Sequence, residues 1–161
     1  MEVGESMNNE NFATYNNICG NNCPEVNLNL TQNANVLEPC DLITYTATIV
    51  NNDPLVTNAT FRDCLPDPIA FIPGTLYLNG VNYPTLNPEV AFPISFVALG
   101  NTVTISYVCR AYGDACCCVK TSKCDCCRQF RTVCNRAQLC FRQCCCQKVV
   151  NSNTLGVQVE Y

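Results

Sequence analysis

The sequence predicts an all-β antiparallel sandwich, and three observations support this fold class. Residues 42–50 and 102–109 alternate apolar and polar side chains, as half-buried antiparallel strands do. Threonine fills the polar positions of the first segment, and β-branched residues suit the outer face of a sheet. Short apolar segments recur along the chain between turns rich in Asn, Asp, Gly and Pro. Short strands at this spacing are typical of two packed sheets.

The two clearest strands each place their apolar residues on one face. These residues are Ile43, Tyr45, Ala47 and Ile49 in the first strand, and Val103, Ile105, Tyr107 and Cys109 in the second. The same alternation predicts strands at residues 26–30 and 154–161. In the segment 57–66, we expect Ala59, Phe61 and Leu65 to face inward.

Turn residues separate the remaining elements. Pro73-Gly74 and Asn79-Gly80 are predicted to be turns on either side of a short strand. The segment 90–99 reads as a strand that contains a proline, so we expect it at a sheet edge or a bulge.

Composition divides the chain into three regions. Residues 1–24 form a polar, Asn-rich segment that we interpret as a flexible arm. Residues 25–110 together with 148–161 are assigned to the β-sandwich, and residues 111–147 to a cysteine-rich basic insertion before the last strand. Part of this insertion fits either a strand pair or a short helix. Its apolar residues are too few for a second core, so we expect sulfur or a partner to hold it.

The cysteine and histidine contents limit the possible chemistry. The chain has 161 residues, of which 16 are cysteine and none is histidine. Cysteine at this level usually marks a disulfide scaffold. The lack of histidine excludes Ser-His-Asp and Cys-His catalysis and removes the usual nitrogen ligand for metals. We therefore assign no catalytic residue and no metal site, and we expect no cofactor and no enzymatic activity.

The first residues, MEVGESMNNENF, contain neither a basic stretch nor an apolar one, so we expect no signal peptide. No apolar run approaches the ~18 residues that span a membrane, and we expect no membrane partner. The sulfur content indicates an oxidising compartment, whereas this start indicates synthesis in the cytosol. Lysis of the producing cell would reconcile the two.

Charge is distributed unevenly along the chain. Residues 1–115 carry 11 acidic side chains against two arginines, whereas residues 116–148 carry seven basic side chains against one aspartate. An acidic body with a basic segment favours contacts between copies of the chain. The candidates for these contacts are Lys120, Lys123, Arg128, Arg131, Arg136 and Arg142. Nucleic acid is not an expected partner, because the whole chain is acidic and its basic segment offers few aromatic side chains for stacking.

The segment DLITYTATIVNNDPLVTNATFRDCLPDPIAFIPGTLYLNG resembles the conserved-repeat, immunoglobulin-like modules of bacterial and archaeal surface proteins. The matching positions are Tyr45-Thr46, Asn51, Asn58-Ala59-Thr60, Asp63-Cys64-Leu65-Pro66, Phe71 and Pro73-Gly74. GNTVTISY and VVNSNTLGVQVEY are similar to the last two strands of that family. The resemblance implies a seven-stranded immunoglobulin-like sandwich that serves as a spacer or surface unit without activity of its own.

The chain departs from that family between these last two strands, where a cysteine-rich insertion replaces a short turn. Cysteine-dense chains that carry such a module are similar to clostridial spore-surface proteins, including those that form the crystalline basal layer of the exosporium. This resemblance implies synthesis in the mother-cell cytoplasm, assembly on the spore, and release when the mother cell lyses.

These observations predict a structural, self-assembling exosporium protein that forms a disulfide-cross-linked, two-dimensional lattice acting as a protective permeability barrier. The expected partners are copies of the same chain in a ring or lattice, together with other spore-surface proteins. We expect most disulfides within the chain and some between chains. The cross-link candidates are Cys19, Cys23, Cys40, Cys64, Cys109, Cys116, Cys117, Cys118, Cys124, Cys126, Cys127, Cys134, Cys140, Cys144, Cys145 and Cys146. Adjacent cysteines rarely bond each other, so bonding between the triplets 116–118 and 144–146 would close the base of the insertion.

Two other functions remain open at this point. The stretch KCDCC is similar to metallothionein sequences, and thiolates bind Zn or Cu(I), but no clean pair of CxxC motifs is present. An oxidoreductase would use a CxxC thiol on a βαβ scaffold, and Cys124 and Cys127 have that spacing without the scaffold. Asp63 and Asp67 are interpreted as turn residues, with a calcium contact as the alternative.

Overall fold

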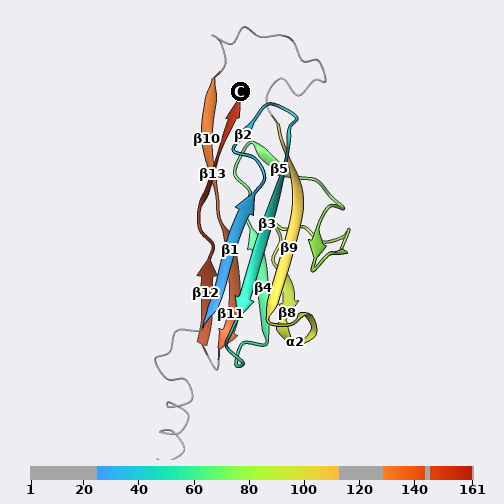
Figure 1. The fold of residues 1–161 in the computed structure, drawn as a ribbon, viewed down its shortest axis with the longest axis vertical. Coiled ribbons are helices and arrows are strands. Elements are labelled where there is room, and N and C mark those ends of the chain that lie inside the picture. Colours follow the sequence, from blue (N-terminus) through green and yellow to red (C-terminus); the bar gives the residue numbers. More distant parts are fainter. Residues whose placement is uncertain (1–24, 113–128, 144–145, 161) are drawn as a thin grey trace, which may run out of the picture.

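The structure, a computed structural model, describes residues 25–112, 129–143 and 146–160. Strands dominate this part of the chain, and nearly all of them pair antiparallel, which confirms the predicted all-β class. The strands form two layers that run along the length of the body (Figure 1). The short helix α2 (Phe96–Leu99) follows strand β8 and occupies the second half of the segment that we predicted as a strand.

The first layer is built on a long central pair of strands. β3 and β9 pair over almost their whole length, with Tyr45 opposite Tyr107 and Ile49 opposite Val103. The strands of this layer are β1 (Val26–Gln32), β3 (Leu42–Asn51), β9 (Thr102–Ala111), β5 (Ile69–Phe71), β6 (Tyr77–Leu78) and β7 (Val81–Asn82). Asn79 and Gly80 connect β6 to β7 with positive φ angles of 48° and 79°, which confirms the predicted tight turn.

The second layer contains a long hairpin made by the last part of the chain. β10 pairs with β13 and β11 pairs with β12, so residues 130–143 run antiparallel to residues 146–160. This layer consists of two sheets. One has the order β10 (Phe130–Asn135), β13 (Leu155–Glu160), β2 (Val36–Leu37), and the other β12 (Cys146–Asn151), β11 (Ala137–Gln143), β4 (Asn58–Asp63), β8 (Phe92–Ser95). β8, with Pro93, lies at the edge of its sheet, as the proline predicted.

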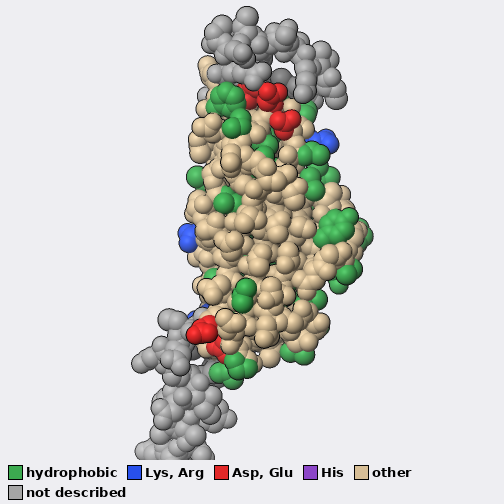
Figure 2. Space-filling view, viewed as in Figure 1, with side chains coloured by type: hydrophobic (Ala, Val, Ile, Leu, Met, Phe, Trp, Pro, Cys, Tyr) green, Lys and Arg blue, Asp and Glu red, His purple; other side chains and the backbone are tan. Residues whose placement is uncertain are grey.

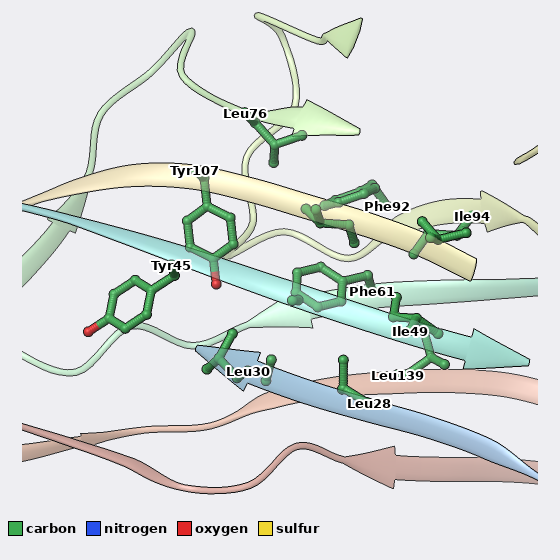
Figure 3. Close-up of a cluster of buried hydrophobic side chains, with 14 of the residues drawn as sticks. Leu28, Leu30, Tyr45, Ile49, Phe61, Leu76, Phe92, Ile94, Tyr107 and Leu139 are labelled. Carbon is green, nitrogen blue, oxygen red and sulfur yellow. The ribbon is translucent and has the colours of Figure 1, made fainter. Parts of the chain in front are cut away.

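The core lies between the two layers. Every inward residue predicted on the two clearest strands is buried, as are Ala59 and Phe61, while Leu65 is partly buried. Figure 3 shows side chains from both layers meeting, among them Leu30 and Tyr107 from the first and Phe61 and Leu139 from the second. The rings of Phe61 and Phe92 pack with their centroids 5.6 Å apart. A fully buried leucine such as Leu139 stabilises the folded state by about 2–5 kcal/mol relative to alanine.

The structure corrects the interpretation of residues 130–143, which we had placed in a separate insertion. These residues form β10 and β11, and β11 lies between β4 and β12 in one sheet. Their inward apolar residues Val133, Ala137, Leu139 and Phe141 join the common core. Sulfur or a partner is therefore not needed to hold them, because they are ordinary core-facing strand residues.

Candidate functional site

Five cysteine side chains are described, and they occupy different environments. Cys109 is fully buried on β9, Cys140 is half-buried, and Cys40, Cys64 and Cys134 are exposed. Cys146 begins β12. The other predicted cross-link residues lie outside the described residues: Cys19, Cys23, Cys116, Cys117, Cys118, Cys124, Cys126, Cys127, Cys144 and Cys145. Within the described part of the chain, Cys64, Cys109, Cys134 and Cys140 form no disulfide with one another.

Cys109 is chemically protected by its position. Burial, together with the nearby charges of Asp63 and Glu89, raises the pKa of its thiol far above the ordinary value. The thiolate is the reactive form of cysteine, so this side chain behaves as a small apolar core residue. The result agrees with its predicted inward position on β9.

Cys64, Cys134 and Cys140 project from the outer side of the second layer. On β10 and β11 the inward residues are odd-numbered and the outward residues even-numbered, so Cys134 and Cys140 share the outer face. Cys140 lies between Val149 on β12 and Thr60 on β4. Cys64 directly follows the last residue of β4 and is exposed.

The structure places three of the six predicted basic contact residues. Arg131 forms an ion pair with Asp67 at 3.3 Å and donates a hydrogen bond to the Asp67 carbonyl oxygen. The Nε of Arg136 donates to the carbonyl oxygen of Ser152 at 3.1 Å. Arg142 is exposed on β11. Two of the three therefore make contacts within their own chain, and Lys120, Lys123 and Arg128 lie outside the described residues.

Asp67 connects the two segments that flank residues 113–128. Its Oδ1 accepts a hydrogen bond from the Tyr112 hydroxyl at 2.8 Å, and its Oδ2 contacts Arg131. These contacts lower the pKa of the Asp67 carboxyl. The side chain is exposed, which agrees with the predicted turn position.

Asp63 differs from its interpretation as a surface turn residue. It is fully buried at the end of β4, where its Oδ2 accepts hydrogen bonds from the Tyr107 hydroxyl and from the Asn135 amide, the latter at 2.8 Å. Burial raises the pKa of the carboxyl, and its hydrogen bonds oppose that rise only in part. Ala59 and Phe61 face inward, and the same alternation places residue 63 on the inward side. This alternation was the signal in the sequence that Asp63 is buried.

This buried polar cluster joins the two layers through the core. Tyr107 belongs to the first layer, whereas Asp63 and Asn135 belong to the second. Tyr45, which lies opposite Tyr107, also points its ring into the core, but no partner of its hydroxyl is found among the described residues. A buried polar group without a partner costs stability, so the two tyrosines make unequal contributions.

Charged side chains are sparse on the face formed by β1, β3 and β9. Figure 2 shows this face, where acidic side chains gather near the two ends of the body and the middle is mostly uncharged. Within the described ranges, no group of three or more His, Cys, Asp or Glu side chains is arranged to hold a metal ion. The same part of the chain contains no helix with the length and apolar character that crossing a bilayer requires.

Comparisons with known proteins identify no family. No family model matches the chain, and neither does any curated protein. One similar solved structure is the Pseudomonas fluorescens alkylpurine DNA glycosylase AlkC bound to DNA, at 11% identity and a TM-score of 0.43. That alignment covers 86% of this chain and 31% of the glycosylase, so this chain spans about a third of it. AvmM, which catalyses macrocyclization in alchivemycin A biosynthesis, is similar at 11% identity and a TM-score of 0.37, with 86% of this chain and 89% of AvmM covered.

Proposed function

We propose that the protein is a structural component of the spore surface that assembles with copies of itself into an ordered, disulfide-cross-linked layer. The observation that carries this proposal is the position of the thiols relative to the core. Apolar side chains from both layers close the core, while Cys64, Cys134 and Cys140 lie outside it. Bonds within the body are not required to hold the fold, so these thiols are available to join chains.

The body has the architecture that a surface unit needs, and we propose that it is an immunoglobulin-like sandwich. The order β1-β3-β9 with β5 or β6 beside β9 follows the A-B-E-D order of immunoglobulin sheets. The order β12-β11-β4 follows G-F-C of the opposite sheet. In this scheme the cysteine-rich residues 113–128 lie between the fifth and sixth strands, earlier in the chain than the sequence suggested.

The described residues that flank the two cysteine triplets, Tyr112 and Gln143, lie at opposite ends of the body. Tyr112 and Arg131 meet at Asp67 at one end, and β10 and β11 run from there to Gln143 at the other end (Figure 1). Gln143 lies twelve positions after Arg131 along β10 and β11, a span of about 40 Å. The six residues from Tyr112 to Cys118 can extend only about 20 Å. We therefore expect any disulfide between residues 116–118 and 144–146 to join two neighbouring chains and not two ends of one chain.

A unit with thiols on one face, and with cysteine-rich segments that adjoin both ends of its described body, would be able to extend in two dimensions. Cyclic rings joined by further contacts would give a lattice, and the spaces between subunits would act as a permeability barrier. Cross-links would make this layer resistant to heat and denaturants, because covalent bonds between chains persist when noncovalent contacts are lost. Each disulfide that closes a loop within a chain would also stabilise the folded state by roughly 2–4 kcal/mol. The basic side chains then contact acidic surfaces of neighbouring copies or of other spore-surface proteins.

The proposal is tested on purified full-length protein that has been oxidised and then analysed by gel electrophoresis with and without reductant. We expect a ladder of species that collapses to a monomer with reductant, and ordered sheets in electron micrographs. Protein alkylated before oxidation provides the control and should remain monomeric. A native monomer whose thiols are all free, or which holds stoichiometric zinc, would contradict the proposal.

A further inference from the structure

The outer face of β10 and β11 carries two thiols. Its outward residues between positions 132 and 142 are Thr132, Cys134, Arg136, Gln138, Cys140 and Arg142. Ala137 is the midpoint of this series and faces the core. Cys134 and Cys140 are therefore equally far from Ala137, on opposite sides of it.

We propose that this face pairs with the same face of a second copy, so that Cys134 of each chain bonds Cys140 of the other. This inference rests on the proposed function and names the contact that links the chains. The two-fold axis lies in the interface and crosses the strands at Ala137, which makes the contact isologous. Two disulfides then form in each pair of chains.

The geometry of one chain excludes the same bond within that chain. Cys140 lies six positions after Cys134 along an extended stretch of chain, which places their Cα atoms about 20 Å apart. A disulfide requires about 4.4–6.8 Å between Cα atoms. Both residues lie on one run of β10 and β11 that is broken only at Arg136, so the chain cannot fold back to join them.

The charges on this face suit the two-fold arrangement. The axis brings Arg142 opposite Thr132 of the partner and Arg136 opposite Gln138, so no arginine of this row faces another arginine. The side chain of Arg136 is also held by its own chain, because its Nε donates a hydrogen bond to the carbonyl oxygen of Ser152. Like charges placed directly opposite each other would weaken the contact, and this arrangement avoids them.

Each thiol has one small neighbour on an adjacent strand. Stacked sheets usually lie about 10 Å apart, which is more than a disulfide spans, so the two faces must approach each other more closely at the thiols. Cys134 lies opposite Gly156 on β13, and its outward neighbour on β10 is Thr132. Cys140 lies between Thr60 on β4 and the exposed Val149 on β12. The exposed thiol of Cys134 therefore stands beside a position that has no side chain.

Formation of each disulfide between the chains requires an oxidant, and a low-molecular-weight disulfide can supply it. A low-molecular-weight disulfide accepts two electrons and two protons from the thiols of Cys134 and Cys140 and leaves as two small thiols. One sulfur–sulfur bond forms between the chains and one breaks in the small disulfide. The reaction proceeds in two exchange steps through a mixed disulfide.

The first test maps the linked cysteines directly. Equal amounts of unlabelled and ¹⁵N-labelled full-length protein are mixed while reduced, oxidised with glutathione disulfide, digested, and analysed by mass spectrometry. We expect a linked peptide that contains Cys134 and Cys140 and that includes mixed-isotope pairs. If oxidised assemblies form but both thiols are free or bonded to other cysteines, this inference is wrong while the proposed function stands. If no reductant-sensitive species forms at all, the proposed function itself fails.

The second test changes the surface and leaves both cysteines in place. A Cβ atom at position 156 would meet only the Cγ2 of Thr132, at 3.7 Å, which is an ordinary van der Waals contact, so the Cβ of Gly156→Val fits the fold. We expect Gly156→Val to lower the yield of the linked peptide several-fold while the thermal unfolding midpoint stays unchanged. The matched control is Thr104→Val, on the outer face of the other layer, which should leave the yield unchanged. An undiminished yield in Gly156→Val would overturn the inference.

Discussion

The hydroxyl of Tyr107 donates a hydrogen bond to the carboxyl of Asp63 across the core, from the first layer of strands to the second. Tyr45, its neighbour on β3, lies 5.9 Å away between ring centroids. Two buried tyrosines on adjacent strands therefore differ mainly in whether their hydroxyl groups have a described partner.

This difference predicts that replacing tyrosine with phenylalanine lowers stability at Tyr107 but not at Tyr45. Tyr107→Phe removes a donor from a buried carboxyl and should lower the free energy of unfolding by about 1–3 kcal/mol. Tyr45→Phe removes a hydroxyl without a described partner and should leave stability unchanged or slightly raised. Chemical denaturation of the two variants measures both effects. Equal losses in the two variants would refute the role assigned to Tyr107.

Asp63 makes stability depend on pH in a defined direction. Burial raises the pKa of its carboxyl in the folded protein above the unfolded value. Its contribution to stability is therefore fully present below the unfolded pKa of about 3.9 and is lost as the pH rises through the folded pKa. We expect the stability of the natural protein, relative to Asp63→Asn, to fall between acidic and neutral pH. Denaturation curves across this range test the sign, and a relative gain in stability with rising pH would contradict it.

Leu139 tests whether residues 130–143 belong to the body. Leu139 is fully buried between the layers, and Leu139→Ala should lower the free energy of unfolding by about 2–5 kcal/mol. Its neighbour Gln138 points outward, and Gln138→Ala should change stability by less than about 0.5 kcal/mol. If both variants unfold like the natural protein, the segment is not part of the common core.

The described thiols should differ in their reactivity. Under native conditions with reductant, Cys64 and Cys134 should be alkylated rapidly by iodoacetamide, while Cys109 should react only after unfolding. Mass spectrometry of timed samples distinguishes them. Rapid labelling of Cys109 in the folded protein would show that the core opens at β9.

The sequence was most informative where apolar and polar residues alternate without interruption. The inward-facing positions of the segments 42–50 and 102–109 were predicted correctly for that reason. The turn at Asn79-Gly80 was predicted correctly because these two residue types adopt positive φ angles readily. Residues 130–143 also alternate, but Asn135 interrupts the inward apolar series and the cysteines and arginines dominate the composition. Tertiary pairing with β4 and β13, which local patterns do not encode, decides their structure.

The buried polar cluster could be predicted only in part. The alternation of apolar and polar residues in β4 places Asp63 on the inward face. Its hydrogen-bond partners, however, come from β9 and β10, which are distant in the sequence. The pairing of Tyr112 and Arg131 through Asp67 has the same origin, because these residues meet only after the strands have assembled.

The long hairpin also has a mechanical consequence. Its strands run lengthwise through the body, so a pull applied from one end to the other acts parallel to them (Figure 1). Tension in that direction loads the backbone hydrogen bonds of β10–β13 and β11–β12 in shear, all together, whereas a sideways pull would open them one after another. A sheet built from such units would resist stretching along the strands far better than peeling across them.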